Sequence, residues 1–418
     1  YFKFKGTEIL TIGSELLFGD ILNSNAKWIA EELSKIGLIA SRQTTIGDSV
    51  PVISQEILNA SKRSSLLITT GGLGPTEDDL TKEAIAQAFK TTLVQNKEVL
   101  LEISAKTKRD IKELGILNKQ AAFPKDSEII ANATGTAPGI IWEPKENFVI
   151  MVFPGVPSEL KNMWEVNAAP WIKKHLAFQT KSFSKRILLN DIGESIVAED
   201  CKEIFKSKNP EVAPYAAPGQ VKIRITAKAN SKVEANNLIL PIEKEFKKKY
   251  KNKLLSSNEK SLSESVFKSL IEKNQTISIA ESCTGGLLSL SFCQFPGASS
   301  IFMGGVVAYS NQQKINLLNV SKSKIEKYGA VSKEIAEEMA IGIKEITQTD
   351  WAISVSGIAG PSGGDNNKPV GLVHFCVAGP NIINSSYRKF GDFKTRAEIQ
   401  NLSVTICLDS LRKSLLSI

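Results

Sequence analysis

The chain has 418 residues, of which 42% are hydrophobic and 23% are charged, and its net charge is +8. These values are ordinary for a globular protein, and the length predicts about two to four domains. No apolar run approaches the roughly 18 residues that cross a membrane, so no membrane partner is expected. The lysines are spread along the chain, so direct binding of nucleic acid is not expected either.

Cysteine and histidine are both scarce. The five cysteines are scattered, no pair has the spacing of metal ligands, and their number is odd. This pattern predicts reduced thiols and a cytoplasmic protein rather than a disulfide framework. The only histidines are His175 and His374, so a histidine-rich metal site in each domain is excluded.

The first 175 residues alternate between apolar segments and amphipathic ones. The predicted strands and helices span, in chain order, residues 7–12, 24–36, 38–45, 52–60 and 65–70. This βαβαβ order predicts a doubly wound parallel sheet with helices on both faces. Farther along, we expect polar helices up to Leu117 and two more strands before the domain closes near His175.

Glycines and acidic residues follow the predicted strands at the sheet edge where such folds bind ligands. Glycines let the backbone approach a phosphate closely, and a helix after Thr76 would present its positive end there. Carboxylates beside such a cradle suit a divalent cation such as Mg²⁺, held partly by substrate phosphates. Asp79 could instead form a capping box with Thr76, a role that is not open to Asp78. The predicted cradle is Gly71, Gly72 and Gly74, and the predicted metal ligands are Glu15, Asp48, Asp78 and Asp79.

Residues 176–255 have a different pattern, in which the element order is β-α-β-β-α. The elements predicted there are strands at 183–189, near Ala213 and at 221–226, and helices at 194–205 and 233–250. This order predicts a small α+β domain of ferredoxin-like or KH-like shape. An RNA-binding KH domain would carry a Gly-x-x-Gly loop between its helices, and none stands there, so we expect a structural spacer or a dimer element. Residues 251–260 are expected to form a linker.

Residues 256–418 predict a second α/β layer domain, organised around an abrupt turn. The buried strand at 276–280 ends in Ser282, Cys283, Thr284 and two glycines. A strand that turns sharply into a helix gathers N–H groups and the helix dipole, which suits a nucleophile, an oxyanion or a phosphate. The alternative is a tight turn whose Ser and Thr side chains only cap the helix. The other predicted elements are a helix at 262–273, a strand at 306–308, a helix from 311, a strand from 354 into a glycine-rich loop, a strand at 368–377 and a helix from about 395.

Motifs in the first domain resemble known families. Gly71-Gly-x-Gly followed by Asp79 is similar to the molybdopterin-binding fold of the MoaB and MogA proteins. The string from Gly13 to Ala26, together with Gly71–Asp79 and Pro154–Glu159, resembles the CinA family. That resemblance implies a metal-dependent ADP-ribose pyrophosphatase, and it does not imply molybdopterin synthesis.

The last domain resembles the CinA C-terminal domain, a nicotinamide mononucleotide deamidase called PncC when free-standing. The motifs in family order are Ala280-Glu-Ser-x-Thr-Gly-Gly286, Tyr309-Ser-Asn-x-x-Lys314, Gly357-Ile-Ala-Gly-Pro-x-Gly-Gly364 and Lys368-Pro-Val-Gly371. The resemblance implies a serine amidase that needs no cofactor, with Ser282 as nucleophile and Lys314 and Tyr309 as its partners. The implied substrate contacts are Thr284, Gly285, Gly286, Gly357, Gly360, Gly363 and Arg396. Gln400 departs from the family, which commonly has a second arginine there, and this departure bears on phosphate binding.

A cysteine mechanism stays open beside the serine one. Cys283 and His374 are the residue types of a cysteine nucleophile and its base, although a histidine between Val373 and Phe375 is more typical of a core or surface residue. For the serine mechanism, Lys314 must be neutral, which requires burial or a neighbouring positive charge to lower its pKa.

The sequence thus predicts three domains, at 1–175, 176–255 and 256–418, with two hydrolytic sites. The expected substrates are ADP-ribose for the first domain and nicotinamide mononucleotide for the last, and the expected assembly is a homodimer. Two other classes of function stay open. One is a non-catalytic scaffold used in DNA uptake, which the family's competence-linked name suggests, and the other is a molybdopterin-type binding module.

Overall fold

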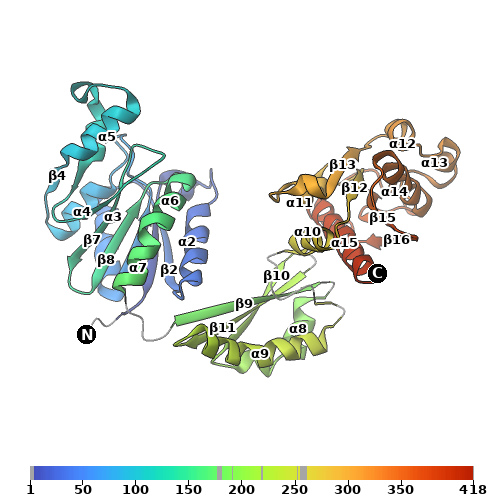
Figure 1. Cartoon of the computed structure of the whole chain (residues 1–418), viewed down its shortest axis with the longest axis horizontal. Helices are drawn as coiled ribbons and strands as arrows, with labels where there is room; N and C mark the ends of the chain where they lie inside the picture. Colours follow the sequence, from blue (N-terminus) through green and yellow to red (C-terminus); the bar gives the residue numbers. More distant parts are fainter. Residues whose placement is uncertain are drawn as a thin grey trace. The chain divides into compact units, whose positions relative to one another are not determined.

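The computed structural model describes residues 4–176, 181–190, 192–217, 220–251, 253–254 and 261–417 (Figure 1). The chain divides into two compact units, residues 1–184 with 227–236, and residues 185–226 with 237–418. The domain boundaries predicted at 175 and 255 lie beside segments outside the described residues and stay predictions. Within the described part, no helix is long and apolar enough to span a bilayer.

Six strands form the first sheet, in the order β2-β1-β3-β8-β7-β6. Neighbours among β2, β1, β3 and β8 run parallel, as predicted, whereas β7 and β6 add an antiparallel edge. Only Glu146 and Asn147 join β7 to β8, and so short a link can connect only antiparallel strands. The strands are β1 (Thr7–Ile12), β2 (Ala40–Ile46), β3 (Leu66–Thr70), β6 (Glu128–Ile130), β7 (Gly139–Lys145) and β8 (Phe148–Phe153). β4 (Leu93–Gln95) and β5 (Ala122–Pro124) form a separate antiparallel sheet of two strands, and β4 lies where only helices were predicted.

Helices cover both faces of this sheet, which confirms the doubly wound prediction for its parallel part. Neighbouring residues of β1 point to opposite faces, so Ile9 and Leu10 enter two different cores. Ile53 of α3 packs in the core of Leu10, and Ile29 of α2 packs in the core of Ile9. The helices are α1 (Ser14–Phe18), α2 (Ser24–Lys35), α3 (Val50–Arg63), α4 (Thr81–Phe89), α5 (Lys97–Thr107), α6 (Pro157–Met163) and α7 (Ala169–His175).

Two helix starts differ from the sequence prediction. The side chain of Asn23, rather than that of Ser24, caps α2. The helix expected directly after Thr76 begins only at Thr81, because the Thr76 N–H and hydroxyl donate to Asp79 in a turn. Asp79 therefore stabilises a turn before α4 rather than capping the helix itself.

The middle sheet has three strands in the order β10-β11-β9, and its elements follow the predicted β-α-β-β-α order. Buried and exposed side chains alternate from Val221 to Ile225 of β11, as the sequence predicted, whereas the next two residues are both buried. The helix predicted to reach Phe205 ends at Asp200. Of the predicted linker, Leu254 pairs with Leu189 of β9, and 255–260 lie outside the described residues. The elements are β9 (Lys181–Asn190), α8 (Glu194–Asp200), β10 (Glu211–Ala217), β11 (Gln220–Ala229) and α9 (Lys232–Lys249).

The last sheet has the order β13-β12-β14-β15-β16, in which β15 and β16 are antiparallel to their neighbours. The strand predicted at 368–377 begins only at Leu372, because Lys368 and Gly371 belong to a hydrogen-bonded loop. The strands are β12 (Ile277–Glu281), β13 (Phe302–Val307), β14 (Trp351–Gly357), β15 (Leu372–Gly379) and β16 (Ile382–Lys389). The helices are α10 (Leu262–Lys273), α11 (Leu287–Cys293), α12 (Asn311–Leu318), α13 (Lys322–Tyr328), α14 (Lys333–Thr347) and α15 (Arg396–Leu416).

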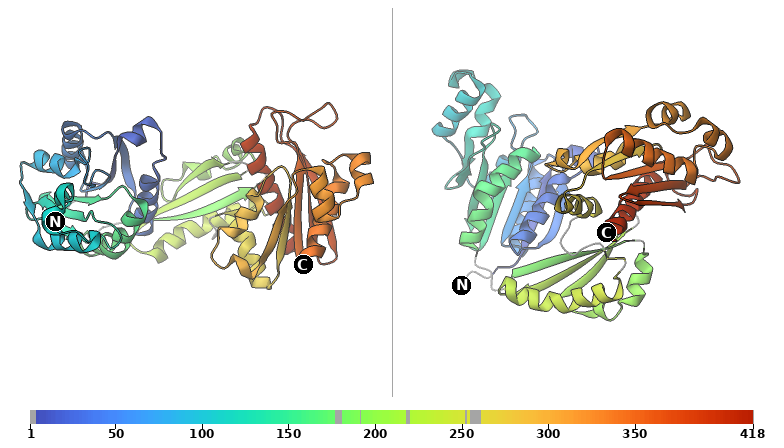
Figure 2. Two further views of the ribbon diagram at one scale, coloured as in Figure 1. Left: turned by 90° about the horizontal axis from the view of Figure 1, so that it is seen from above. Right: turned by 45° about the vertical axis from the view of Figure 1, so that its right-hand side comes forward.

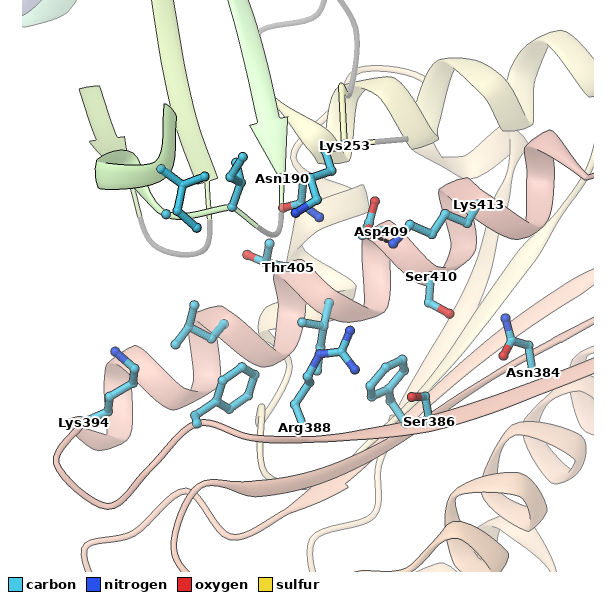
Figure 3. Close-up of a pocket in the computed structure, with 17 residues that line it drawn as sticks. Asn190, Lys253, Asn384, Ser386, Arg388, Lys394, Thr405, Asp409, Ser410 and Lys413 are labelled. Atoms are coloured by element: carbon cyan, nitrogen blue, oxygen red, sulfur yellow. Dashed lines mark ion pairs between the residues drawn. The ribbon is translucent and has the colours of Figure 1, made fainter. Parts of the chain in front are cut away.

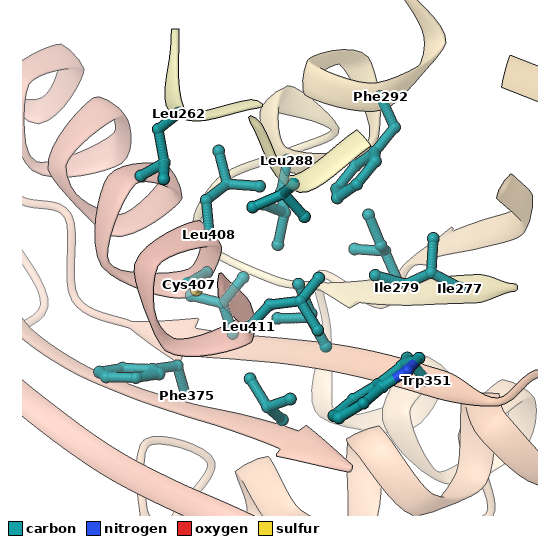
Figure 4. Packing of buried hydrophobic residues seen from close by; sticks show 14 of the residues in the cluster. Leu262, Ile277, Ile279, Leu288, Phe292, Trp351, Phe375, Cys407, Leu408 and Leu411 are labelled. Carbon is teal, nitrogen blue, oxygen red and sulfur yellow. The ribbon is translucent and has the colours of Figure 1, made fainter. Parts of the chain in front are cut away.

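Two cores flank this sheet and give the predicted α/β/α layers. Ile335 of α14 packs on one face, and Leu262 of α10 and Leu411 of α15 pack on the other. Figure 4 shows Leu411 near the labelled Trp351 of β14, and both views of Figure 2 show α15, in red, running along the sheet. Leu188 of β9 enters the same core, so the middle sheet and the last domain share packing.

We predict that Leu411→Ala lowers the free energy of unfolding by about 2–5 kcal/mol, because Leu411 is 0% exposed and its removal leaves a cavity. The matched control is Leu416→Ala on the same helix, where the side chain is 73% exposed. The control should change stability by less than about 0.5 kcal/mol. Urea denaturation measures both changes, and similar losses in the two variants would contradict the described packing.

Candidate active site

A buried carboxylate organises the turn that follows β12. Glu281 ends the strand with 0% exposure, although it stands in an otherwise apolar segment. Its two oxygens accept five hydrogen bonds of 2.6–3.0 Å from the residues that follow. The donors are the hydroxyls of Thr284 and Ser289 and the N–H groups of Gly286, Leu288 and Ser289. Because a buried charge must be fully hydrogen-bonded, Glu281 fixes the path of the chain into α11.

These contacts correct the roles predicted for the glycines of the turn. We expected N–H groups of Thr284, Gly285 and Gly286 to serve an oxyanion or a phosphate. Instead, the Gly286 N–H donates to Glu281, and the Gly285 N–H donates to the Ser282 carbonyl at 3.2 Å. Thr284 binds Glu281 through its hydroxyl, so its N–H keeps the predicted role as a proposal. Gly286 has a φ of 105°, which a residue with a side chain rarely adopts.

Ser282 and Lys314 meet in the interior of the last domain. The distance from Lys314 Nζ to Ser282 Oγ is 3.0 Å, and Lys314 and Ser282 are 1% and 8% exposed, respectively. Lys314 reaches Ser282 from the first turn of α12, which Ser310 caps. The Ser282 N–H donates to the carbonyl of Val355 on β14, which ties the serine to the neighbouring strand. The sequence predicted this pair of residues, and the fold brings their reactive atoms within hydrogen-bond distance.

The surroundings of Lys314 favour a neutral amine. Burial lowers the pKa of Lys314, and no described carboxylate forms an ion pair with it. Its Nζ also lies 2.9 Å from the Ala308 carbonyl and 3.4 Å from the Tyr309 carbonyl. A neutral amine has two N–H groups for these carbonyls and one lone pair that can accept the Ser282 proton.

Tyr309 and Arg396 form a second group beside this pair. The Tyr309 hydroxyl accepts a hydrogen bond from the Arg396 guanidinium at 2.5 Å, and the same guanidinium donates to the Gly360 carbonyl at 2.8 Å. Tyr309 therefore approaches Lys314 with its backbone carbonyl, whereas its hydroxyl points to Arg396. Gly357 is the last residue of β14, and Gly360 and Gly363 lie in the glycine-rich loop that follows it.

Gln400 supports the reactive turn directly. Its side-chain N–H donates to the Cys283 carbonyl at 2.8 Å, one residue after Ser282. At this position a glutamine therefore holds the turn from α15. Together, Arg396 and Gln400 tie the start of one helix to both the glycine-rich loop and the serine turn.

The structure does not bring Cys283 and His374 together as a catalytic pair. Cys283 is 5% exposed and lies in the apolar core, where burial raises the pKa of its thiol to about 12. His374 stacks on Tyr387 of β16, with 5.5 Å between ring centroids. A thiol with so high a pKa is a poor nucleophile, so the geometry favours the serine over the cysteine.

The glycines of the first domain permit close backbone contacts around a second cavity. This cavity has a volume of about 410 Å³ and lies at the carboxyl ends of β1 and β3. At Gly71 a Cβ would lie 2.0 Å from the Ile12 carbonyl oxygen, and at Gly72 it would lie 2.2 Å from the Thr81 hydroxyl. At Gly74 a Cβ would lie 2.3 Å from an Asp79 carboxylate oxygen. Larger residues would disrupt the turn at Gly71 and Gly72, where φ is also positive, and at Gly74 they would displace the Asp79 side chain.

The predicted acidic residues line that cavity but do not converge on one point. Asp48 accepts two bonds of 2.8 Å from Ser14, and Asp79 accepts bonds from Thr76, so both hold loops in place. Across the described residues, no group of three Asp, Glu, His or Cys side chains could hold a metal ion. Such a donor set fits only a cation that takes most of its ligands from water and substrate phosphates. The acidic residues lining the cavity include Glu15, Asp48, Asp78 and Asp79.

Two residues that support these sites were not predicted. Glu281 lies inside one of the sequence motifs, but we predicted no role for it. A single acidic residue at the end of a buried strand could have indicated a buried hydrogen-bonded carboxylate. Lys119 gave no signal, because it lies far along the chain from the loop that it binds. Its amine contacts the carbonyls of Thr76 and Asp79, and it lies 3.4 Å from Glu83.

Three family models match the chain in succession. A probable molybdopterin binding domain matches residues 8–174, the damage-inducible protein CinA KH domain matches 184–254, and the CinA C-terminal domain matches 259–415. With the sheets described above, these matches define a protein that joins an α/β domain of the probable molybdopterin-binding type, a KH-like domain and a CinA-type α/β/α domain. The predicted fold class is confirmed.

Relatives over the full length agree with this class. A CinA-like protein of Prochlorococcus marinus strain MIT 9312 is 50% identical over 416 residues, which cover 99% of this chain and 98% of that protein. A CinA-like protein of strain MIT 9515 is 49% identical over 416 residues, which cover 99% of this chain and 96% of that protein. A solved structure, the competence/damage inducible protein CihA from Agrobacterium tumefaciens, is 34% identical over 37% of this chain and 93% of that one, with a TM-score of 0.36. The chain belongs to the CinA family, as its motifs predicted.

We predict that Glu281→Gln lowers the free energy of unfolding by about 1–3 kcal/mol, because an amide nitrogen would face N–H donors that then lack an acceptor. The matched control is Glu398→Gln, since Glu398 also accepts two hydrogen bonds, from Thr395, but is exposed to water. Water can replace an exposed acceptor, so Glu398→Gln should lower the free energy of unfolding by less than Glu281→Gln does. Denaturant midpoints of both variants test this, and an equal loss would contradict the role given to Glu281.

Proposed function

We propose that the last domain hydrolyses the carboxamide of nicotinamide mononucleotide to give nicotinate mononucleotide and ammonia. The observation that carries this proposal is the buried Ser282–Lys314 contact of 3.0 Å, with an amine whose pKa is lowered by burial. A serine hydroxyl reacts only when a base is within hydrogen-bond reach, and a desolvated lysine is such a base. The family resemblance supplies the substrate.

In the proposed reaction, Ser282 Oγ adds to the carboxamide carbon while its proton passes to Lys314 Nζ. Lys314 then gives that proton to the leaving nitrogen, so ammonia departs and an acyl-serine ester remains. Water hydrolyses the ester, which releases the acid and restores Ser282. Arg396 is exposed and cationic beside the glycine-rich loop, which suits the phosphate of the substrate. The N–H group of Thr284 has no described acceptor and is available to the oxyanion.

We predict that Ser282→Ala and Lys314→Met each reduce ammonia release from nicotinamide mononucleotide by about a thousandfold or more. The double variant should be little worse than either single one, because the two residues act as a unit. In the wild type, turnover should rise with pH through a pKa below the ordinary lysine value, since only the neutral amine of Lys314 accepts the proton.

The control for this test is Cys283→Ala, which removes the neighbouring thiol and leaves Ser282 and Lys314 in place. It should keep substantial activity. If the cysteine change abolishes turnover and the serine change does not, the serine–lysine assignment is wrong.

We also propose that the first domain cleaves the pyrophosphate of ADP-ribose. The support is a cavity of about 410 Å³ that combines a glycine-rich turn with exposed carboxylates. A divalent cation, when bound, would neutralise the charge of the phosphates, with Asp78 and Glu15 as its protein ligands. Hydrogen bonds from Thr76 and the Asp78 backbone, with Lys119 nearby, hold the pKa of the Asp78 carboxyl below its usual value, so it stays ionised at neutral pH.

We predict that Asp78→Asn abolishes metal-dependent cleavage of ADP-ribose with little loss of stability, because Asp78 is exposed. The matched control is Glu77→Gln, which removes the same charge from the adjacent exposed residue. Formation of AMP from ADP-ribose, followed over a range of Mg²⁺ concentrations, measures the turnover of both variants. Unchanged turnover of Asp78→Asn at saturating Mg²⁺ would refute a metal role for this residue.

Two measurements separate these activities from the remaining classes of function. Salt-dependent DNA binding without amide hydrolysis would favour a scaffold in DNA uptake. A copurifying pterin, detected by its fluorescence, would favour a molybdopterin-type binding module. Ammonia release from nicotinamide mononucleotide by the purified chain would favour the proposed deamidase over both.

A further inference from the structure

A cavity of about 620 Å³ lies between the end of β9 and the surface formed by β15, β16 and α15 (Figure 3). It is separate from the two sites described above, because none of the predicted site residues lines it. Both of its sides belong to one compact unit, residues 185–226 with 237–418. The two sides are in contact next to the cavity, because Leu188 of β9 packs in the core of the last domain and Asn190, two residues later, lines the cavity.

The strand β16 presents a continuous polar row to this cavity. Asn384, Ser386 and Arg388 all line it, and they are alternate residues of one strand, which share a face. Figure 3 shows Arg388 and Ser386 on the sheet, with Thr405 and Asp409 of α15 above them. The other face of β16 carries Tyr387, which stacks on His374.

The charge of the lining is strongly positive. Asp409 is the only acidic residue among the described residues that line it, and it already pairs with Arg412 at 2.8 Å and Lys413 at 2.6 Å. The basic residues that line the cavity are Lys253, Arg388, Lys394 and Lys413. An excess of cations in a concave site attracts an anion, and arginine is well suited to a phosphate group.

The remaining lining suits an aromatic ring with polar edges. Phe375 and Phe390 contribute ring surfaces. Asn190 is 3% exposed, and its side-chain oxygen has no hydrogen-bond partner. A buried acceptor without a partner is unusual in a folded protein and marks a position for a donor on a bound molecule, such as an exocyclic amine. The volume is within the ordinary range for small-molecule sites.

We propose that this cavity binds an adenine nucleoside phosphate and that its occupancy changes the rate at the Ser282 site. The phosphates contact Arg388 and Lys394, and the base lies by Phe390 with its amine toward Asn190. The coupling runs through α15, whose first turns hold the glycine-rich loop and the serine turn and whose later turns line the cavity. The binding does not depend on the proposed deamidase, whereas the coupling rests on it.

The test uses the full chain and ADP as the probe, with binding measured by calorimetry in the absence of divalent metal. The double variant Arg388→Gln/Lys394→Gln should weaken ADP binding by about tenfold or more, because it removes two charge-assisted contacts. The matched control is Lys389→Gln/Lys344→Gln, which removes two charges from residues that do not line the cavity. Ser410→Trp, which fills the cavity from α15, is a second way to block it.

The site is supported if ADP binding is weakened by Ser410→Trp and in the Arg388/Lys394 variant. Binding should be retained in the matched control, in Ser282→Ala and in Asp78→Asn. Unchanged ADP binding in the Arg388/Lys394 and Ser410→Trp variants, or equally tight binding of adenosine, overturns it. ADP should also change the deamidation rate of the wild type but not that of the Arg388/Lys394 variant. If ADP binds at this site without changing a measurable rate, the coupling is wrong. If no deamidation occurs at all, it is the proposed function that fails.

Discussion

The carboxylate of Glu281 is fully buried, and the chain that follows it is wrapped around its two oxygens. A buried charge without partners is so costly that the turn can take only a path that supplies donors. That path leaves Ser282 at the end of β12, with its N–H tied to Val355. It also leaves Lys314 without a carboxylate partner in the described part, since the acceptors of Glu281 are occupied by the turn. The Glu281 carboxylate is stabilised by the hydrogen bonds of the turn and not by Lys314, so no ion pair opposes the neutral form of the Lys314 amine.

The helix α15 connects this turn with the rest of the last domain. Its first turns carry Arg396 and Gln400, which hold the glycine-rich loop and the Cys283 carbonyl. Its buried side, including Leu411, packs on the sheet between β12 and β15. The position of the reactive turn therefore depends on the packing of a helix that lies more than a hundred residues away in sequence.

The cavity of the first domain depends on a different constraint, which is the close approach of neighbouring groups to the backbone of its glycines. Gly71 leaves no room for a side chain beside the Ile12 carbonyl, and Gly72 leaves none beside Thr81. Asp48 and Asp79 are used to hold the loops that border the cavity. The backbone shape is thus fixed by glycines and short polar bonds, and the exposed acids are left for a ligand.

The sequence by itself determined the elements whose signal is local. The apolar run at β1 and the amphipathic α10 were predicted to the residue, because periodicity and capping act within a few neighbours. The alternating β11 was also predicted, although it ends three residues later than expected. The motifs also gave Ser282 and Lys314 as candidates. The antiparallel edge of the first sheet, the late start of α4 and the partners of Tyr309 and Arg396 were decided by the tertiary structure. Each of these features depends on groups that are distant in the chain or on competing hydrogen bonds. The pKa shifts also depend on the tertiary structure, because burial lowers the pKa of Lys314 and raises that of Cys283, and burial exists only once the chain is packed.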